Sequence, residues 1–159
     1  MSMEDLSSVL WQERELLETL LYKLEVEQLV LAGGRTRWLP AAAREIDACL
    51  GRIREVELLR AVAVDTVAAE LDLDPNPSLH EIADRSEEPW RCIWLDHREA
   101  FTTVAAQIAQ MSESNRTLLT AGYQAAQATL LSMSESAGTY GADGSVDEGR
   151  RASLVDRSL

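Results

Sequence analysis

The sequence is short of basic, aromatic and helix-breaking residues. Its 159 residues include 15 Lys and Arg against 27 Asp and Glu, which gives a net charge of −12. Because phosphate groups bind to basic surfaces, this balance argues against nucleic acid and an anionic membrane surface as partners. Only 4 prolines and 8 glycines interrupt a chain rich in Ala, Leu, Glu and Arg. This composition is typical of an all-α protein.

Signals for a membrane or secreted protein are also missing. No run of about 18 apolar residues occurs, so no membrane-spanning helix is expected. The first residues, 1–5, are Met-Ser-Met-Glu-Asp, an acidic start without the apolar core of a signal peptide. We therefore expect no signal peptide and a cytoplasmic protein. Cys49 and Cys92 are far apart in the sequence, and in that compartment we expect both to be reduced and packed in the core.

Motifs for catalysis, metals and phosphate binding are absent as well. The chain has two histidines, His80 and His97, and neither belongs to a metal-binding motif. Asp96 precedes His97 directly, so on a helix the two side chains point about 100° apart and do not form a catalytic pair by themselves. The sequence thus predicts no enzyme, no cofactor and no metal.

Apolar residues at three- and four-residue spacing predict three long helices, over 3–31, 38–71 and 87–133. Gly33 and Gly34 are expected to end the first, because glycine accepts the left-handed conformation of a helix C-terminus. The prolines within residues 74–77 are expected to end the second.

Capping residues indicate where the second helix starts and predict a short extra one. Thr36 is the expected N-cap of the second helix, with Pro40 in its first turn, where the missing N–H costs nothing. Ser78 and Glu81 have the spacing of a capping box, which predicts a short helix over 79–84.

These elements predict an elongated antiparallel bundle of three long helices. The bundle would occupy residues 1–133, and a flexible tail rich in Gly, Ser and Asp would occupy 134–159. Because the third helix is the longest, its part beyond about residue 118 outruns its partners. That part exposes a set of apolar side chains: Leu118, Leu119, Tyr123, Leu130, Leu131 and Met133.

Charge is unevenly distributed among the predicted helices. Residues 1–31 carry seven acids and two bases, residues 35–74 carry eight acids and six bases, and residues 89–133 carry three of each. Two interpretations of the neutral third helix stay open. One is that it is the central helix of the bundle, buried on more sides. The other is that part of it awaits a partner helix, and both can hold for different halves.

Two motifs near the C-terminus resemble those of a known family. Residues 110–119 contain Asn115 followed at the third and fourth positions by Leu118 and Leu119, which resembles the Asn-x-x-Leu-Leu signature of the FlgN family of flagellar export chaperones. Residues 140–144, Tyr-Gly-Ala-Asp-Gly, resemble that family's Tyr-Gly-x-x-Gly ending. Residues 10–17 are similar to its leucine-rich opening helix, and the resemblance covers residues 6–144.

The resemblance implies a fold, a function and partners. Members of the family are small, acidic, cytoplasmic helical proteins. They bind the C-terminal helical segments of the hook–filament junction proteins FlgK and FlgL, keep them unassembled and present them to the flagellar type III export apparatus. An apolar groove for an amphipathic segment is compatible with the exposed apolar side chains of the third helix.

The expected client-binding residues are Ile108, Met111, Asn115, Leu118, Leu119, Tyr123, Leu130, Met133 and Tyr140. Asn115 is the polar member of this set, and it either selects the partner and the register or faces solvent. We expect Asn115→Leu to keep or raise thermal stability. The alternative function is a helical module that associates with itself through the same surface, and weak self-association is expected when no client is bound.

Overall fold

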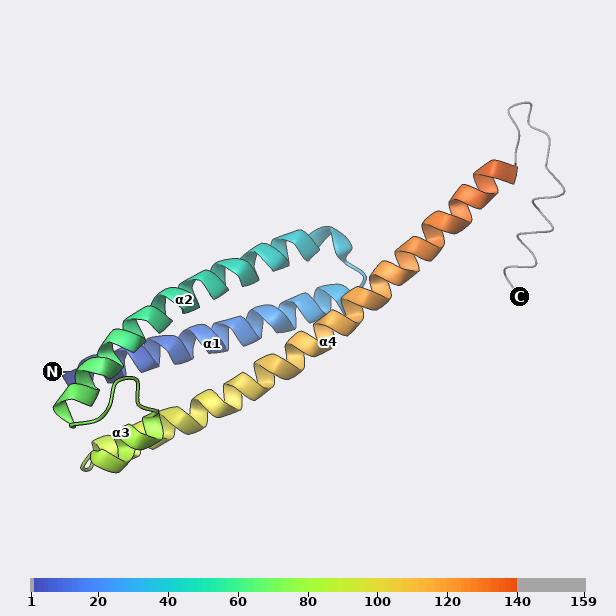
Figure 1. Ribbon diagram of the computed structural model, residues 1–159. Coiled ribbons are helices and arrows are strands. Elements are labelled where there is room, and N and C mark those ends of the chain that lie inside the picture. The colour runs from blue at the N-terminus through green and yellow to red at the C-terminus, as the bar shows by residue number, and fades with distance from the viewer. Residues whose placement is uncertain (1, 140–159) are drawn as a thin grey trace. The chain divides into compact units, whose positions relative to one another are not determined.

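The computed structural model describes residues 2–139, and within that range it contains helices and no strand (Figure 1). The predicted all-α class is confirmed. The elements in chain order are α1 (Ser2–Ala32), the 3₁₀ turn η1 (Thr36–Trp38), α2 (Leu39–Glu70), α3 (Leu79–Arg85) and α4 (Trp90–Thr139). The chain divides into two compact units, Met1–Arg116 and Thr117–Leu159.

The turn between α1 and α2 differs in one detail from the prediction. Gly34 adopts a left-handed φ of 65°, as expected after a helix. Thr36 is not the N-cap of α2, because it begins the 3₁₀ turn and the N-cap is Trp38, whose side chain forms no capping hydrogen bond. Pro40 lies in the first turn of α2, as predicted.

The start of α3 follows the prediction closely. The Ser78 side chain accepts a hydrogen bond from the Glu81 amide, and the Glu81 carboxylate accepts one from the Ser78 amide. The capping box therefore forms. The hydrogen bond from the Ser78 backbone amide, and next the Ser78 side chain, lower the pKa of the Glu81 carboxyl.

Helix α4 has different bounds from those predicted. It begins at Trp90 rather than at residue 87, and the Glu88 carboxylate caps it by accepting a hydrogen bond from the Cys92 amide. It continues past Met133 to Thr139. Most of the predicted tail, residues 140–159, lies outside the described residues.

Helices α1 and α2 run antiparallel. The Arg60 guanidinium binds the Glu13 carboxylate at 3.1 Å, and the Lys23 ammonium lies 3.3 Å from the Glu45 carboxylate. As residue numbers rise along α1, they fall along α2. Figure 1 shows the two helices side by side.

The part of α4 that belongs to the first unit runs parallel to α1. The Arg14 guanidinium binds the Asp96 carboxylate at 3.0 Å, and the Gln28 amide donates to the Ser114 hydroxyl at 2.8 Å. Residue numbers therefore rise together along both helices. Within residues 1–116 the chain goes up, down and up again.

Two clusters of buried apolar side chains form the core of this unit. The first lies where α3 meets the other helices: Leu6, Leu10, Val64, Val67, Leu79, Ile82, Ala83 and Trp94. The second joins the middles of α1 and α2: Leu16, Leu20, Leu24, Cys49, Ile53 and Val56. Both cysteines are free, and Cys49 is buried as expected. Cys92 is exposed, so the expectation that it packs in the core is wrong.

Candidate functional site

The predicted binding residues fall into separate environments along α4. Ile108 and Met111 are half-buried and pack against the second core cluster. Leu118 is also half-buried. Tyr140 lies outside the described residues. The first two of these residues therefore contribute to holding α4 on the bundle.

Asn115 is the last buried residue of α4 within the described range. Its side chain is 2 % exposed, so it does not face solvent. Its amide nitrogen donates to the Leu24 carbonyl at 2.9 Å and to the Glu27 carboxylate at 3.0 Å. Its amide oxygen is buried and accepts no hydrogen bond in the described part of the chain. The polar residue of the Asn-x-x-Leu-Leu sequence thus joins α4 to α1.

Beyond Asn115, α4 carries a line of exposed apolar side chains. Leu119 is 40 % exposed, and Tyr123, Leu130 and Met133 are each about two-thirds exposed. Together with the exposed Ala126 they follow spacings of four, three, four and three residues. Apolar residues at this spacing form the line along which one helix packs against another in a coiled coil. We call these five residues the α4 strip.

The surroundings of the α4 strip contain no charge. Residues 117–134 include no Asp, Glu, Lys, Arg or His, although the chain as a whole carries −12. The polar side chains among them are Thr, Gln, Ser and Tyr, and the Gln127 amide donates to the Tyr123 hydroxyl at 3.0 Å. Leu131, which was outside the predicted set of binding residues, lies beside the strip and is 62 % exposed. Such a surface can bind an apolar helix face without desolvating an ion.

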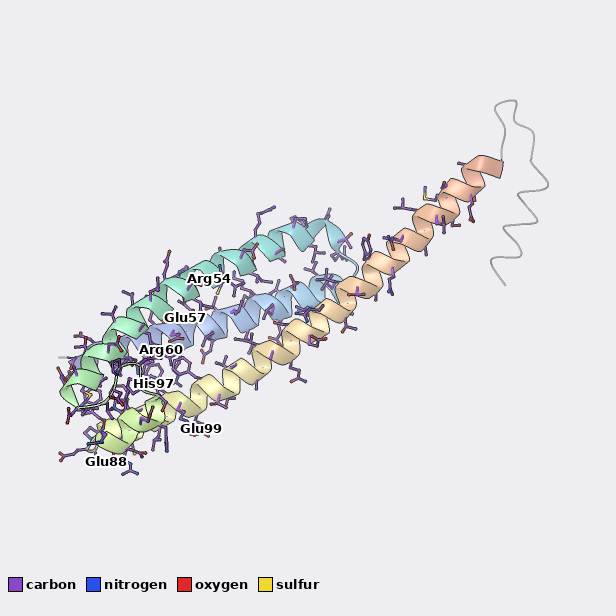
Figure 2. The ribbon with its side chains drawn as sticks, viewed as in Figure 1. Arg54, Glu57, Arg60, Glu88, His97 and Glu99 are labelled. Carbon is purple, nitrogen blue, oxygen red and sulfur yellow. The ribbon has the colours of Figure 1, made fainter. Side chains whose placement is uncertain are left out.

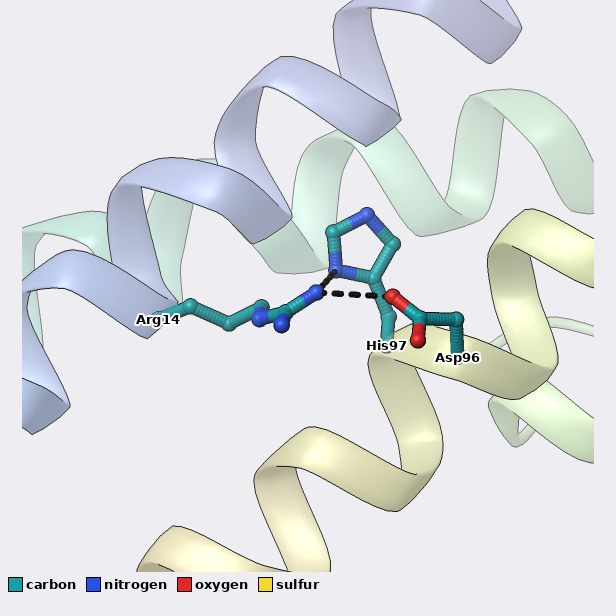
Figure 3. Close-up of polar contacts among 3 residues, drawn as sticks. All are labelled: Arg14, Asp96 and His97. Carbon is teal, nitrogen blue, oxygen red and sulfur yellow. Dashed lines mark hydrogen bonds and ion pairs between the residues drawn. The ribbon is translucent and has the colours of Figure 1, made fainter.

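A polar contact joins the start of α4 to α1. Figure 3 shows the Arg14 guanidinium reaching both the Asp96 carboxylate, at 3.0 Å, and Nδ1 of His97, at 3.3 Å. Because arginine donates only, Nδ1 of His97 must accept, so the neutral ring carries its proton on Nε2. Asp96 and His97 diverge on the helix as predicted, and Arg14 of another helix bridges them.

His97 is 1 % exposed and lies among aromatic rings. Its ring is 5.1 Å from Trp11 edge to face, and it stacks at 6.4 Å on Trp94 and at 6.2 Å on Phe101, measured between centroids. Its Nε2 atom has no hydrogen-bond partner among the described residues. Burial, and next the positive charge of Arg14, lower the pKa of His97. Both effects favour the neutral ring in the folded protein.

A buried glutamate, Glu13, joins α1 to α2. Both of its carboxylate oxygens accept from the Arg60 guanidinium, at 3.1 and 3.2 Å, and Glu13 is 4 % exposed. Burial raises the pKa of Glu13, although Arg60 opposes that shift. Arg60 also lies over the Phe101 ring, 5.3 Å from its centroid, so it contacts α4 as well. Figure 2 labels Arg60 on α2 and His97 on α4.

Sequence reasoning did not identify Glu13 and its partner Arg60, or Glu27 and its contact with Asn115. A signal was present, because Glu13 and Glu27 stand at positions of α1 where the helical spacing places buried leucines. A carboxylate at such a position predicts a buried partner on a neighbouring helix.

The described residues hold no candidate centre for a metal. No group of three or more His, Cys, Asp or Glu side chains within residues 2–139 could bind an ion. None of the described helices is long and apolar enough to cross a membrane.

The sequence matches the FlgN protein family over residues 1–148. The chain belongs to the FlgN family. The match includes α1, α2, α3 and α4. No curated protein and no solved structure matches the sequence.

Membership confirms the family to which the Asn-x-x-Leu-Leu and Tyr-Gly-x-x-Gly sequences pointed. It implies, in broad terms, the role of a flagellar export chaperone that binds flagellar proteins. The FlgN family is a chaperone family and is not enzymatic.

Proposed function

We propose that this protein is a cytoplasmic chaperone that binds the C-terminal helical segments of flagellar hook–filament junction proteins of the FlgK and FlgL type. It keeps these clients from assembling early and delivers them to the flagellar type III export apparatus. The observation that carries the proposal is the α4 strip, a line of exposed apolar side chains on a charge-free stretch of helix.

The spacing of the α4 strip fits a helical client. From Leu119 to Met133 the strip spans two heptads, about 21 Å of helix. A client helix with its own apolar seam can bury all five side chains. Burying a large apolar side chain contributes about 1.5–3 kcal/mol, and part of the total is offset by the entropy lost on association.

The chemistry of the strip also suits a chaperone with more than one client. Met133 adapts to differently shaped partners, because the methionine side chain is unbranched and has three rotatable bonds. A free junction protein exposes its own amphipathic helix before assembly, and covering that apolar face prevents aggregation. The same contacts would be released when the client enters the export apparatus.

The test is calorimetric titration of a synthetic C-terminal segment of such a client into the full-length protein. Leu119→Ala combined with Tyr123→Ala should weaken binding by about ten- to a hundredfold. The melting temperature should barely change, because both side chains are exposed. A control is Leu58→Ala combined with Val62→Ala, which removes two exposed apolar side chains with the same four-residue spacing from α2.

Two results would contradict the proposal. Equal loss of binding in the α2 control would show that general surface apolarity, and not the strip, captures the client. A dimer that forms without client, resists added client and dissociates in the Leu119→Ala/Tyr123→Ala variant would support self-association as the role of the strip. Sedimentation velocity distinguishes that case.

A further inference from the structure

A second surface, separate from the α4 strip, lies between α1 and the part of α4 in the first unit. Two adjoining hollows, of about 420 and 290 Å³, follow one another along the two helices. Leu21 of α1 and Gln107 of α4 line both, so the hollows form one continuous groove. On α4 the groove extends from Asp96 to Ser114, which is about 27 Å of helix.

The groove results from unequal helix spacing. The backbones of α1 and α2 approach closely, whereas α4 is held further from α1. Large rings fill the space at one end, where His97 lies against Trp11 and Phe101. On the face of α4 that lines the groove, side chains such as Ala100 and Gln107 are smaller or more flexible and leave the flank open.

The rim of the groove is acidic on both sides. Glu18 and Glu25 of α1 and Glu99 of α4 line it, and none of them forms an ion pair within residues 2–139. Asp96 also lines it but is paired with Arg14. Figure 2 labels Glu99 on α4. Two of these carboxylates, Glu18 and Glu25, are seven residues apart and therefore lie on one face of α1.

The basic residues of α4 lie away from the groove. Arg98 is two residues, about 200°, from the groove-lining Ala100. Arg91 and Arg116 are seven and eighteen residues from Arg98, whole numbers of turns, so they share its face. All three are exposed. The three arginines of α4 thus lie off the groove, and one of them, Arg116, pairs there with Glu113 at 3.0 Å.

The floor of the groove is apolar. Leu21 is half-buried but belongs to neither core cluster, and Val104 and Met111 line the floor from α4. An apolar floor between acidic rims matches an amphipathic helix with basic residues along its flanks.

We propose that the groove between α1 and α4 docks a basic amphipathic helix of a partner protein. Its apolar residues lie on Leu21 and Met111, and Lys or Arg side chains seven residues apart face Glu18 and Glu25. A second copy of this chain is a poor occupant, because each copy has 27 acidic and 15 basic residues. The site differs in chemistry from the charge-free α4 strip, so one chaperone can hold a client and a basic partner on separate surfaces.

The probe is a fluorescein-labelled helix of about 18 residues with Leu on one face and Lys on its flanks, and anisotropy reports its binding to the full-length protein. A second probe has Gln in place of every Lys. We expect Glu18→Gln combined with Glu25→Gln to weaken binding of the Lys probe about three- to tenfold. Leu21→Ala should weaken binding of both probes, and the Lys probe should bind more tightly than the Gln probe.

The matched control is Asp47→Asn combined with Glu55→Gln, which removes two exposed carboxylates from α2. It should change binding less than about twofold. If both double variants lose the same amount of affinity for the Lys probe, the net charge of the protein explains the binding, and the proposal is overturned. Equal binding of the Lys and Gln probes would overturn it as well.

Two further measurements test whether something other than a basic partner helix occupies the groove. The first uses a synthetic peptide of residues 149–159. If this peptide binds more tightly than the Lys probe, and Glu18→Gln/Glu25→Gln abolishes its binding, the occupant of the groove is this chain's own C-terminus. A dimer that Leu21→Ala dissociates would give the groove to a second copy. Glu18→Gln/Glu25→Gln should leave client binding unchanged. Leu119→Ala/Tyr123→Ala should leave binding of the Lys probe unchanged. The two proposals can therefore fail separately.

Discussion

Two carboxylates buried in α1, Glu13 and Glu27, each have one matching residue on another helix. Arg60 of α2 neutralises Glu13, and Asn115 of α4 donates to Glu27. A buried carboxylate without a partner destabilises the folded state. An axial shift of either helix would separate the carboxylate from its partner and so raise the free energy of the bundle. These contacts select one alignment among several that the leucine repeat alone would permit.

Asn115→Leu is expected to lower the free energy of unfolding by about 1–3 kcal/mol, because it leaves the Glu27 carboxylate buried without its donor. The structure therefore reverses the expectation that this substitution keeps or raises stability. Urea denaturation measures the change. Combining it with Glu27→Leu should recover much of the loss, since the orphaned group is then gone.

The control for that pair is Gln124→Leu on the exposed surface of α4, which should change the free energy of unfolding by less than about 0.5 kcal/mol. Unchanged or increased stability in Asn115→Leu would show that the hydrogen bond to Glu27 does not stabilise the bundle.

His97 should make stability depend on pH on the acidic side of neutrality. Burial keeps its folded pKa below the ordinary value of 6.5. As the pH falls below about 6.5, the unfolded chain takes up a proton that the folded chain does not, so stability decreases. One histidine contributes at most about 1.4 kcal/mol per pH unit. His97→Phe should reduce this slope in urea denaturation between about pH 7 and about pH 5.

His80 provides the comparison, because it is exposed and lies on α3. An equal fall of the slope in His80→Gln would show that the effect is not specific to His97. Glu13 contributes with the opposite sign, since its raised pKa lets the folded state bind a proton more readily. Because Glu13 is present in both variants and in the original protein, its contribution cancels when their slopes of stability against pH are subtracted. An unchanged slope in His97→Phe would exclude His97 as its source.

At the scale of elements, α4 combines two kinds of helix. Up to Asn115 it buries Trp94, His97 and Val104, whereas from residue 117 onward no described side chain is buried. An isolated helix is only marginally stable in water, because its backbone hydrogen bonds gain no support from packing. The second half of α4 thus depends on its intrinsic propensity until a partner covers it.

Hydrogen exchange should reveal this division within one continuous helix. Amides of residues 104–115 should be protected at least about tenfold more than those of residues 120–133. Adding the client segment should raise protection over 120–133, where the α4 strip lies. Mass spectrometry of peptic fragments measures both. Uniform protection along α4 before client is added would mean that its second half is already covered.

At the scale of the whole molecule, charge is unevenly distributed along the chain. The segment 1–31 has a net charge of −5, from seven acids and two bases, whereas residues 117–134 have none. Acidic surfaces keep proteins apart and soluble, while a neutral apolar strip favours association. The acidic unit of residues 1–116 and the neutral strip therefore suit different partners, in line with the two proposed surfaces.

The sequence by itself determined the class of the fold, most helix bounds and the family. Apolar spacing and helix breakers are local signals, and the capping box of Ser78 and Glu81 formed where it was predicted. The start of α2 was placed less well, because the Thr36–Trp38 segment continues the turn instead of capping a helix. The exposure of Leu119 and Tyr123 also followed from the excess length of the last helix.

Only the tertiary structure decided which residues of that helix pack on the bundle and which remain exposed. Ile108 and Met111 have the same apolar character and spacing as the α4 strip, yet they lie against the second core cluster. The tertiary structure also decided that Asn115 binds Glu27 and that Arg14 bridges Asp96 and His97. Helical spacing places residues on a common face, but it does not say which helix meets that face. That choice depends on side-chain volumes and buried charges from segments up to 91 residues apart.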